Sequence, residues 1–311
     1  MAGLRPRSRT ERGVILAFAT AAISGLSIYL NSYGVKQVPD AAVYTTAKNG
    51  VAAVLLIALA LSFGAARESK VLDGRRRLGL LAIAIVGGSI PFVLFFTGLA
   101  QATAPSAAFI QKTLFIWVAV MAMPLLGERI GRIQIGALVV LLGGLVLVAP
   151  PTGMGWGTGE TLIAIATLMW SVEIILAKRL LVGMSAPLLG AARMGLGAVI
   201  LVGYLAFTGK LAALFQINSQ GLLWIVVTGI LLAAYVTTWF GALKAAPATM
   251  VTSILVVGAV VTGVLSTISS GALPDGRVVA GYLLMVVAVV LVAAGGLRMR
   301  RQDAARALAD G

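Results

Sequence analysis

The chain has 311 residues, of which 60% are hydrophobic and 11% are charged, and its mean hydropathy is +1.03. Soluble globular domains carry about 25% charged residues, so this composition excludes a soluble fold and indicates a membrane protein. The sequence has no Cys and no His, which excludes disulfides, thiolate nucleophiles, imidazole bases and the common zinc sites. We therefore expect no enzyme activity, no metal and no other cofactor.

The net charge of +14 arises from basic residues that stand in short runs between apolar segments. Most of those outside the apolar segments lie in the N-terminal tail 1–12, in the segment 64–77 and in the C-terminal tail 298–311. Cytoplasmic segments of membrane proteins retain Lys and Arg, so both tails are predicted to be cytoplasmic, in a bacterial-type inner membrane. This distribution is not that of a nucleic-acid-binding surface, and we expect no nucleic-acid partner.

The apolar segments are each about twenty residues long, which is the length that crosses a hydrocarbon core. Five spans are predicted in the first half, at 13–35, 41–63, 78–100, 105–124 and 131–149. Five more are predicted in the second half, at 159–180, 186–208, 220–242, 248–268 and 277–297. Joints with Gly, Pro or polar residues separate them, such as Ala149-Pro150-Pro151 and Leu273-Pro274-Asp275. The sequence therefore predicts an all-α integral membrane protein with ten transmembrane helices.

The two halves share short motifs in the same order. Three pairs match: Ala47-Lys48-Asn49-Gly50 with Ala192-Arg193-Met194-Gly195, Thr103-Ala104-Pro105-Ser106 with Ala245-Ala246-Pro247-Ala248, and Thr20 and Ser24 with Thr167 and Ser171. A repeat of five spans, an odd number, places its second copy upside down in the membrane. Inverted repeats of this kind usually hold a substrate site at the midplane between them. The motifs therefore predict two inverted five-helix repeats, at 13–149 and 159–297, and favour a transporter.

With these motifs, and with Leu126-Gly127-Glu128-Arg129 before the 131–149 span, the chain resembles the drug/metabolite transporter superfamily in its EamA branch of paired five-helix repeats. In overall composition it is most similar to the YddG-type exporters of aromatic and other neutral amino acids. The resemblance implies a cavity lined in part by the 105–124 span. The second repeat departs from the pattern, since Ser270-Gly271 stands where the acid is expected and Asp275 is displaced.

Ionisable side chains within spans are costly to bury and are site hypotheses by default. Lys48 and Arg193 occupy equivalent repeat positions, and we expect them to be structural anchors within snorkelling reach of the outer interface. Lys112 has no basic counterpart, because Ile254 takes its place. We expect Lys112 to face a substrate carboxylate.

Glu173 lies in the middle of the 159–180 span, close to Trp170. It could carry a proton or meet a substrate ammonium group, and pairing with Lys48, Lys112 or Arg193 is an open alternative. Gln111 and its repeat counterpart Ser253 are further candidates for substrate contact, as is Asn31 through its hydrogen-bonding amide.

Aromatic residues form a second candidate group. Aligning the two repeats through Gly98 and Gly241 pairs Phe92 with Tyr235 and Phe96 with Trp239, each spaced i, i+4 on one helical face. These rings would suit apolar substrate side chains, although simple packing is an equal alternative. Pro91 removes one backbone hydrogen bond, which predicts a kink and a carbonyl available to a cavity.

Two acids are assigned structural roles. Glu160 lies at the start of the 159–180 span, where an acid caps a helix and complements its dipole. Glu128 has Arg129 and Arg132 beside it, and we expect a salt bridge that ties the 105–124 and 131–149 spans together, with a gating role open.

The leading functional hypothesis is a secondary transporter that exports small metabolites, most of all aromatic and other neutral amino acids, by alternating access. The sequence has no glycine-rich ATP-binding loop, so transport must use a gradient. The alternatives are a multidrug or quaternary-amine exporter, a phosphorylated-sugar antiporter, a passive channel and, from another class, a membrane-embedded enzyme. Small residues such as Gly136, Gly143 and Gly144 permit a homodimer.

Overall fold

The computed structural model describes residues 9–99, 101–102, 104–148, 156–271 and 273–309, and this part of the chain folds into helices without strands. The predicted joint Ala149-Pro150-Pro151 lies outside these residues, as do most of the predicted N-terminal tail and Thr103 of the repeat motif.

The described part of the first repeat contains ten helical segments. They are α1 (Arg9–Gly34), η1 (Val35–Gln37), α2 (Ala41–Ser62), α3 (Ala65–Lys70), α4 (Gly74–Ile83), η2 (Ala84–Ser89), α5 (Ile90–Leu99), α6 (Ala104–Lys112), α7 (Leu114–Leu126) and α8 (Arg132–Val148). The third span runs continuously through α4, η2 and α5, and the fourth is divided between α6 and α7. The short helix α3 lies in the basic 64–77 segment, where no helix is predicted from the sequence.

Seven helical segments belong to the second repeat among the residues that the structure describes. They are α9 (Thr158–Leu180), α10 (Ala186–Phe207), η3 (Leu211–Gln216), α11 (Ser219–Ala245), α12 (Ala248–Leu255), α13 (Val257–Ser270) and α14 (Gly276–Ala309). Among the residues described, nine helical stretches are long and apolar enough to cross a membrane, and α8 is a shorter apolar helix of 17 residues. Each corresponds to one of the ten predicted spans, which confirms the predicted fold class.

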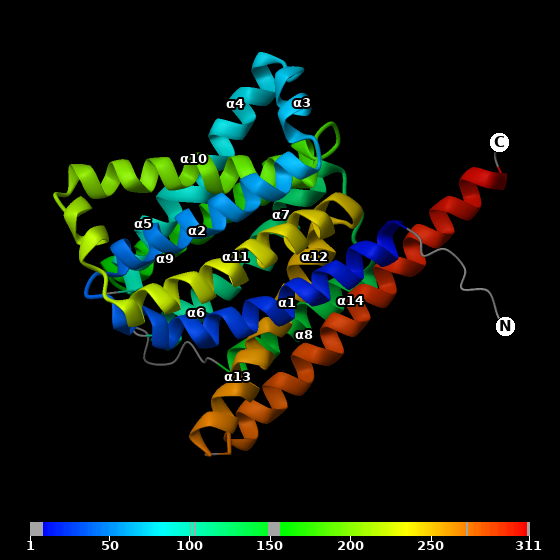
Figure 1. Cartoon of the computed structure of the whole chain (residues 1–311). Coiled ribbons are helices and arrows are strands. Elements are labelled where there is room, and N and C mark those ends of the chain that lie inside the picture. The colour runs from blue at the N-terminus through cyan, green and yellow to red at the C-terminus, as the bar shows by residue number, and fades with distance from the viewer. Residues whose placement is uncertain (1–8, 100, 103, 149–155, 272, 310–311) are drawn as a thin grey trace, which may run out of the picture.

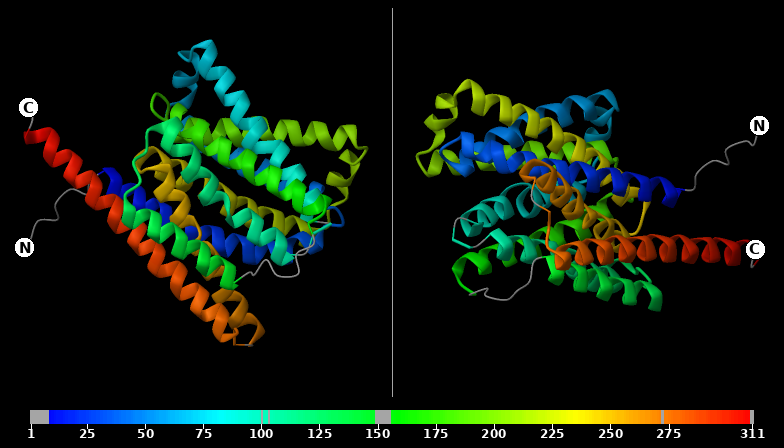
Figure 2. Two further views of the ribbon diagram at one scale, coloured as in Figure 1. Left: turned by 180° about the vertical axis from the view of Figure 1, so that it is seen from behind. Right: turned by 90° about the horizontal axis from the view of Figure 1, so that it is seen from below.

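The main helix contacts are symmetric: the largest contacts between helices of the two halves also form between their counterparts. α1 packs on α11, as its counterpart α9 packs on α5; α2 packs on its counterpart α10, and α8 on its counterpart α14. Figures 1 and 2 show these segments side by side although they are far apart in the sequence. This pairing is the one expected of two inverted repeats that share a common centre.

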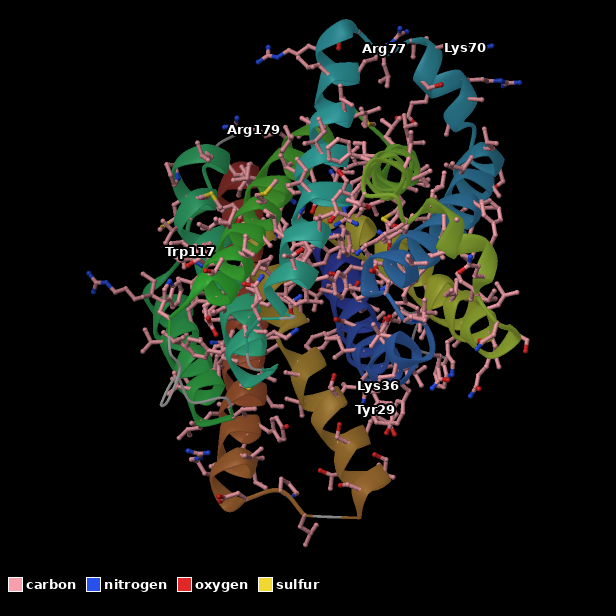
Figure 3. The ribbon with its side chains drawn as sticks, turned by 90° about the vertical axis from the view of Figure 1, so that its left-hand side faces the viewer. Tyr29, Lys36, Lys70, Arg77, Trp117 and Arg179 are labelled. Atoms are coloured by element: carbon pink, nitrogen blue, oxygen red, sulfur yellow. The ribbon has the colours of Figure 1, made fainter. Side chains whose placement is uncertain are left out.

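The bundle has two distinct ends. α1 begins and α14 emerges at one end, which we call the tail end and which also holds Glu128 and Lys244 (Figure 1). The far end holds Asp40, which caps the start of α2 and forms an ion pair of 2.7 Å with Lys210. The pKa of the Asp40 carboxyl is lowered overall. Burial alone would raise this pKa, but the hydrogen bonds from Lys210 and from the N–H groups of α2 outweigh it. Figure 3 shows Lys36 of η1 far from Lys70 in the basic segment.

Small residues allow two backbones to touch where η2 crosses α10. A Cβ added to Gly197 would lie 2.7 Å from the carbonyl oxygen of Gly88 and 2.9 Å from its Cα. In a bilayer no hydrophobic force draws helices together, so such close contacts carry much of the packing. Gly144 is used in the same way against Gly281 of α14, whereas Gly136 and Gly143 have nothing within 4 Å of an added Cβ.

We predict that Gly197→Ala lowers the apparent melting temperature of the detergent-purified protein. The added methyl group must push two helix backbones apart, and overpacking of this kind costs about 1–3 kcal/mol. Gly203→Ala is the matched control, because it lies on the same helix and its Cβ would meet nothing within 4 Å. Equal melting temperatures for the two variants would contradict the close crossing.

Candidate functional site

A cavity of about 970 Å³ lies between the two repeats. Its rim at the far end includes the exposed residues Ser32 and Ser270, and its lining continues past the middle of the bundle to Trp239 and Thr252. The cavity therefore opens at the far end and ends before the tail end. Its volume suits a small organic solute.

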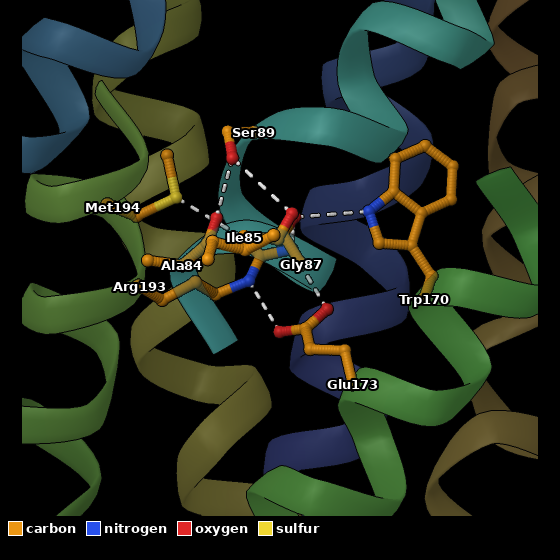
Figure 4. A network of polar contacts seen from close by, with 8 residues as sticks. All are labelled: Ala84, Ile85, Gly87, Ser89, Trp170, Glu173, Arg193 and Met194. Carbon is orange, nitrogen blue, oxygen red and sulfur yellow. Dashed lines mark hydrogen bonds and ion pairs between the residues drawn. The ribbon is translucent and has the colours of Figure 1, made fainter. Parts of the chain in front are cut away.

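One backbone carbonyl at the centre of the bundle lacks its usual partner. Pro91 has no N–H and cannot donate to the carbonyl four residues earlier, which belongs to Gly87. The chain is already widened there, because η2 is a π-helical turn. The Gly87 carbonyl instead accepts hydrogen bonds from Arg193 Nη2 at 3.0 Å and from Trp170 Nε1 at 3.2 Å (Figure 4). Segments from three helices thus meet at a carbonyl that the proline makes available.

Glu173 and Arg193 form a buried ion pair beside this carbonyl. Arg193 Nε lies 2.5 Å from Glu173 Oε1, Arg193 Nη2 lies 3.2 Å from Oε2, and the side chains are 9% and 3% exposed (Figure 4). A Cβ on Gly87 would overlap the carboxyl group of Glu173, so a larger residue there would have to displace that group. Of the three partners left open by the sequence, the structure pairs Glu173 with Arg193, and both carboxylate oxygens are engaged.

We predict that Glu173→Met destabilises the protein by roughly 3–5 kcal/mol, because it leaves the Arg193 guanidinium buried without its counter-charge. The double variant Glu173→Met, Arg193→Met removes both charges and should recover most of this loss, since two apolar groups can replace a buried pair. Apparent melting temperatures in detergent measure both effects. A double variant no more stable than the single one would contradict a pair held mainly by charge.

Lys48 is held by a second polar group, which also lines the cavity. Its Nζ donates to Asn31 Oδ1 at 3.1 Å and lies 5.5 Å from the centre of the Tyr44 ring. Tyr44 also donates to Asn31 Oδ1 at 3.0 Å, and its hydroxyl is 2.8 Å from that of Thr228. The Asn31 amide is fixed in turn by a bond to the Ser27 carbonyl at 2.7 Å. Asn31 and Lys48 therefore face the cavity as one unit, and every partner of Lys48 in this unit is neutral.

The expectation that Lys48 and Arg193 snorkel toward the outer interface is wrong. Both residues are buried, with 7% and 8% exposure. Each finds partners inside the bundle, so neither needs to reach the bilayer surface to keep its charge solvated.

Lys112 lines the cavity at a break in the fourth span. α6 ends at Lys112 and α7 begins at Leu114, and the second repeat breaks at the equivalent place, where α12 ends at Leu255 and α13 begins at Val257. Discontinuous helices often carry the binding groups of transporters. Within the described residues, Lys112 forms no hydrogen bond and no ion pair, and its neighbour Gln111 also lines the cavity.

The four aromatic residues predicted from the repeat all line the cavity. Tyr235 and Trp239 stack with ring centres 5.9 Å apart and an interplanar angle of 12°. Phe92 instead packs edge-on against Trp170 at 5.5 Å, and Trp170 also lines the cavity.

Phe95 is a lining residue that the sequence analysis missed. Its ring lies 5.6 Å from that of Phe96 and 5.6 Å from that of Trp170. Helical spacing could have predicted this residue, because Phe92, Phe95 and Phe96 follow an i, i+3, i+4 pattern on one helix face. The repeat alignment hid it, since Thr238 occupies the matching place in the second repeat.

Ser253 does not line the cavity. It is fully buried, and its hydroxyl donates to the Thr249 carbonyl at 2.7 Å, one turn earlier in α12. Thr252, one residue earlier, is the polar side chain of this turn that faces the cavity.

Glu128 closes the tail end across the two repeats. Its carboxylate accepts hydrogen bonds from the N–H groups of Ala248 at 2.5 Å and Thr249 at 3.0 Å, at the start of α12. The predicted salt bridge with Arg129 or Arg132 is therefore wrong. The unbonded N–H groups at a helix start, with the positive end of the helix dipole, attract a carboxylate strongly.

Basic side chains at the tail end also bond to backbone carbonyls within the second repeat. Lys178 donates to the carbonyls of Leu243 and Ala246, and Lys244 donates to the Met184 carbonyl at 2.9 Å. These bonds join α9, the end of α11 and the segment before α10, and cations suit carbonyl-rich helix ends.

The far end has no equivalent of Glu128 within the residues described. α7 and α13 are each followed by a capping glycine, Gly127 and Gly271, and both glycines adopt the left-handed conformation with φ of 65° and 66°. In the first repeat Glu128 follows, whereas Asp275 of the second repeat accepts from the Arg277 N–H at the start of α14. Glu160 caps α9 as predicted, accepting from the Gly157 N–H at 3.1 Å.

Paired helical repeats around a central cavity define the class: a multi-pass membrane transporter. The model of the EamA-like transporter family matches residues 11–149 and 157–294, so the two matches together cover most of the chain. The chain belongs to the EamA-like transporter family.

One further comparison, with solved structures, shows a similar fold, and another, with curated proteins, finds no match. A crystal structure of a protein with 16% sequence identity superposes with a TM-score of 0.75, over 92% of this chain and 99% of the other. No curated protein matches the sequence.

Proposed function

We propose that this protein exports small carboxylate-bearing metabolites, with aromatic and other neutral amino acids as the first candidates, by alternating access. The observation that carries the proposal is Lys112, a cation without a charged partner in the described residues, in a cavity lined by aromatic rings. Lys112 and Gln111 would bind the carboxylate, and the rings around Trp170, Tyr235 and Trp239 would pack against the apolar part of the substrate.

A quaternary-amine exporter is less well supported. Such a substrate needs an acid in the cavity, and Glu173, the acid of the described lining, is engaged by Arg193 through both oxygens. A sugar-phosphate antiporter would be expected to have a more polar lining than these aromatic rings provide.

The proposed orientation places both termini in the cytoplasm, following the positive-inside rule. The tail end would then be cytoplasmic, and the cavity would open to the outside. Glu128 would act as a latch that keeps the cytoplasmic side closed, and Gly136 and Gly143, which face away from the bundle, could accept a second copy.

Counterflow in proteoliposomes tests the transport function. Liposomes loaded with unlabelled L-phenylalanine should accumulate external labelled L-phenylalanine transiently, because a carrier exchanges substrate while its binding site reorients. L-threonine, a dicarboxylate and a quaternary amine serve as competing internal loads. Equal fluxes with loaded and empty liposomes would indicate a channel, and the absence of flux with every load would overturn the proposal.

We predict that Glu128→Gln increases opening of the tail end about fivefold, because weakening two charge-assisted hydrogen bonds costs about 1 kcal/mol. The chain has no Cys, so a single Ala122→Cys, buried on α7 near the tail end, reports opening through its reaction with a membrane-impermeant thiol reagent applied on that side. Glu160→Gln is the control, because Glu160 caps its own helix at the far end. Unchanged labelling, or equal changes in both variants, would argue against the latch.

A further inference from the structure

Four charged side chains belong to the described lining of the cavity: Lys48, Lys112, Arg193 and Glu173. Three are cationic and one is anionic, so the lining has a net charge of +2 when all four are ionised. A cleft with largely apolar, low-dielectric walls concentrates the electric field of such a charge excess.

The single carboxylate is not available to a substrate. Arg193 engages both oxygens of Glu173, and it is itself held by the Gly87 carbonyl at 3.0 Å. Trp170 bonds to the same carbonyl, and the Glu173 carboxyl group packs closely against Gly87. A substrate ammonium could reach Glu173 only by displacing a buried guanidinium and leaving that charge without a partner.

The two lysines, in contrast, have no counter-charge in the described residues. Lys48 contacts the Asn31 amide oxygen and the face of the Tyr44 ring, both neutral. Lys112 contacts no polar partner there. Each is therefore ready to bind an anionic group, and neither would tolerate a nearby ammonium.

We infer that the preferred substrate is an organic anion: a carboxylate with an aromatic or other apolar body and without an ammonium group. This inference rests on the transport function proposed above, and within its carboxylate-bearing substrates it places carboxylates without an ammonium group ahead of the amino acids. A zwitterion carries no net charge, so it leaves the positive charge of the cavity lining uncompensated. Its ammonium group would also lie among other cations. A dianion compensates both lysines. The aromatic lining selects the apolar body and disfavours a hydrated sugar phosphate.

A charge series on one skeleton tests the inference in counterflow. Benzylmalonate, 3-phenylpropionate, L-phenylalanine and 2-phenylethylamine share a benzyl group and carry charges near −2, −1, 0 and +1 at neutral pH. We expect exchange to fall in that order, with a half-saturation concentration at least about tenfold lower for benzylmalonate than for L-phenylalanine. Protein-free liposomes correct for passive leakage of 3-phenylpropionate.

The outcomes separate the inference from the transport proposal. Exchange of L-phenylalanine equal to or better than that of the two anions would overturn the inference and leave the transport function standing. Faster exchange of glucose 6-phosphate than of benzylmalonate would also overturn it. No exchange of any compound would overturn the transport function itself.

Variants of the two lysines test whether these side chains set the preference. Lys112→Gln and Lys48→Gln should each raise the half-saturation concentration for benzylmalonate about tenfold, with a smaller effect for L-phenylalanine, and Lys112→Arg should retain most of the affinity. Lys36→Gln is the matched control, because Lys36 is an exposed lysine at the far end outside the cavity lining. Equal losses for both substrates, with an unchanged melting temperature, would contradict the role assigned to charge.

Discussion

The missing N–H of Pro91 is the constraint on which the centre of this protein depends. It removes the usual donor from the Gly87 carbonyl, and two side chains from the other repeat, those of Arg193 and Trp170, take its place. Once Arg193 is anchored there, it neutralises Glu173. The two lysines, which lie outside this cluster, then determine the net charge of the cavity. A single backbone defect thus couples packing between the repeats to the electrostatics of the site.

Much of the fold could be predicted from the sequence, because a bilayer allows few solutions. Ten apolar segments had to become helices, and an odd-numbered repeat had to be inverted. The cavity residues on helix faces, such as Phe92, Tyr235 and Trp239, followed from helical periodicity and from the repeat. Lys112 was identifiable as a cation without a counterpart in the other half.

Other features depend on the relative placement of helices, which periodicity does not encode. The partner of Glu173 was open among three cations until the crossing of η2 and α10 brought Arg193 beside it. Glu128 was assigned to its nearest neighbours in sequence, whereas the start of α12, distant in sequence, offers two N–H groups in better geometry. Ser253 and Thr252 differ by one position, and the rotation of one helix decides which of them faces the cavity.

The unequal ends of α7 and α13 have a kinetic consequence. Both finish in the same glycine conformation, but in the described residues Glu128 follows only the first, so the latch proposed above exists at one end alone. Under the alternating access proposed above, this difference would set the resting ratio of the two states and would influence whether the loaded or the empty step limits turnover. The driving gradient alone determines the concentration ratio at which net flux stops, so the difference between the two ends cannot alter this ratio. If the protein works as proposed, the asymmetry of the fold sets the pace of transport and has no influence on its end point.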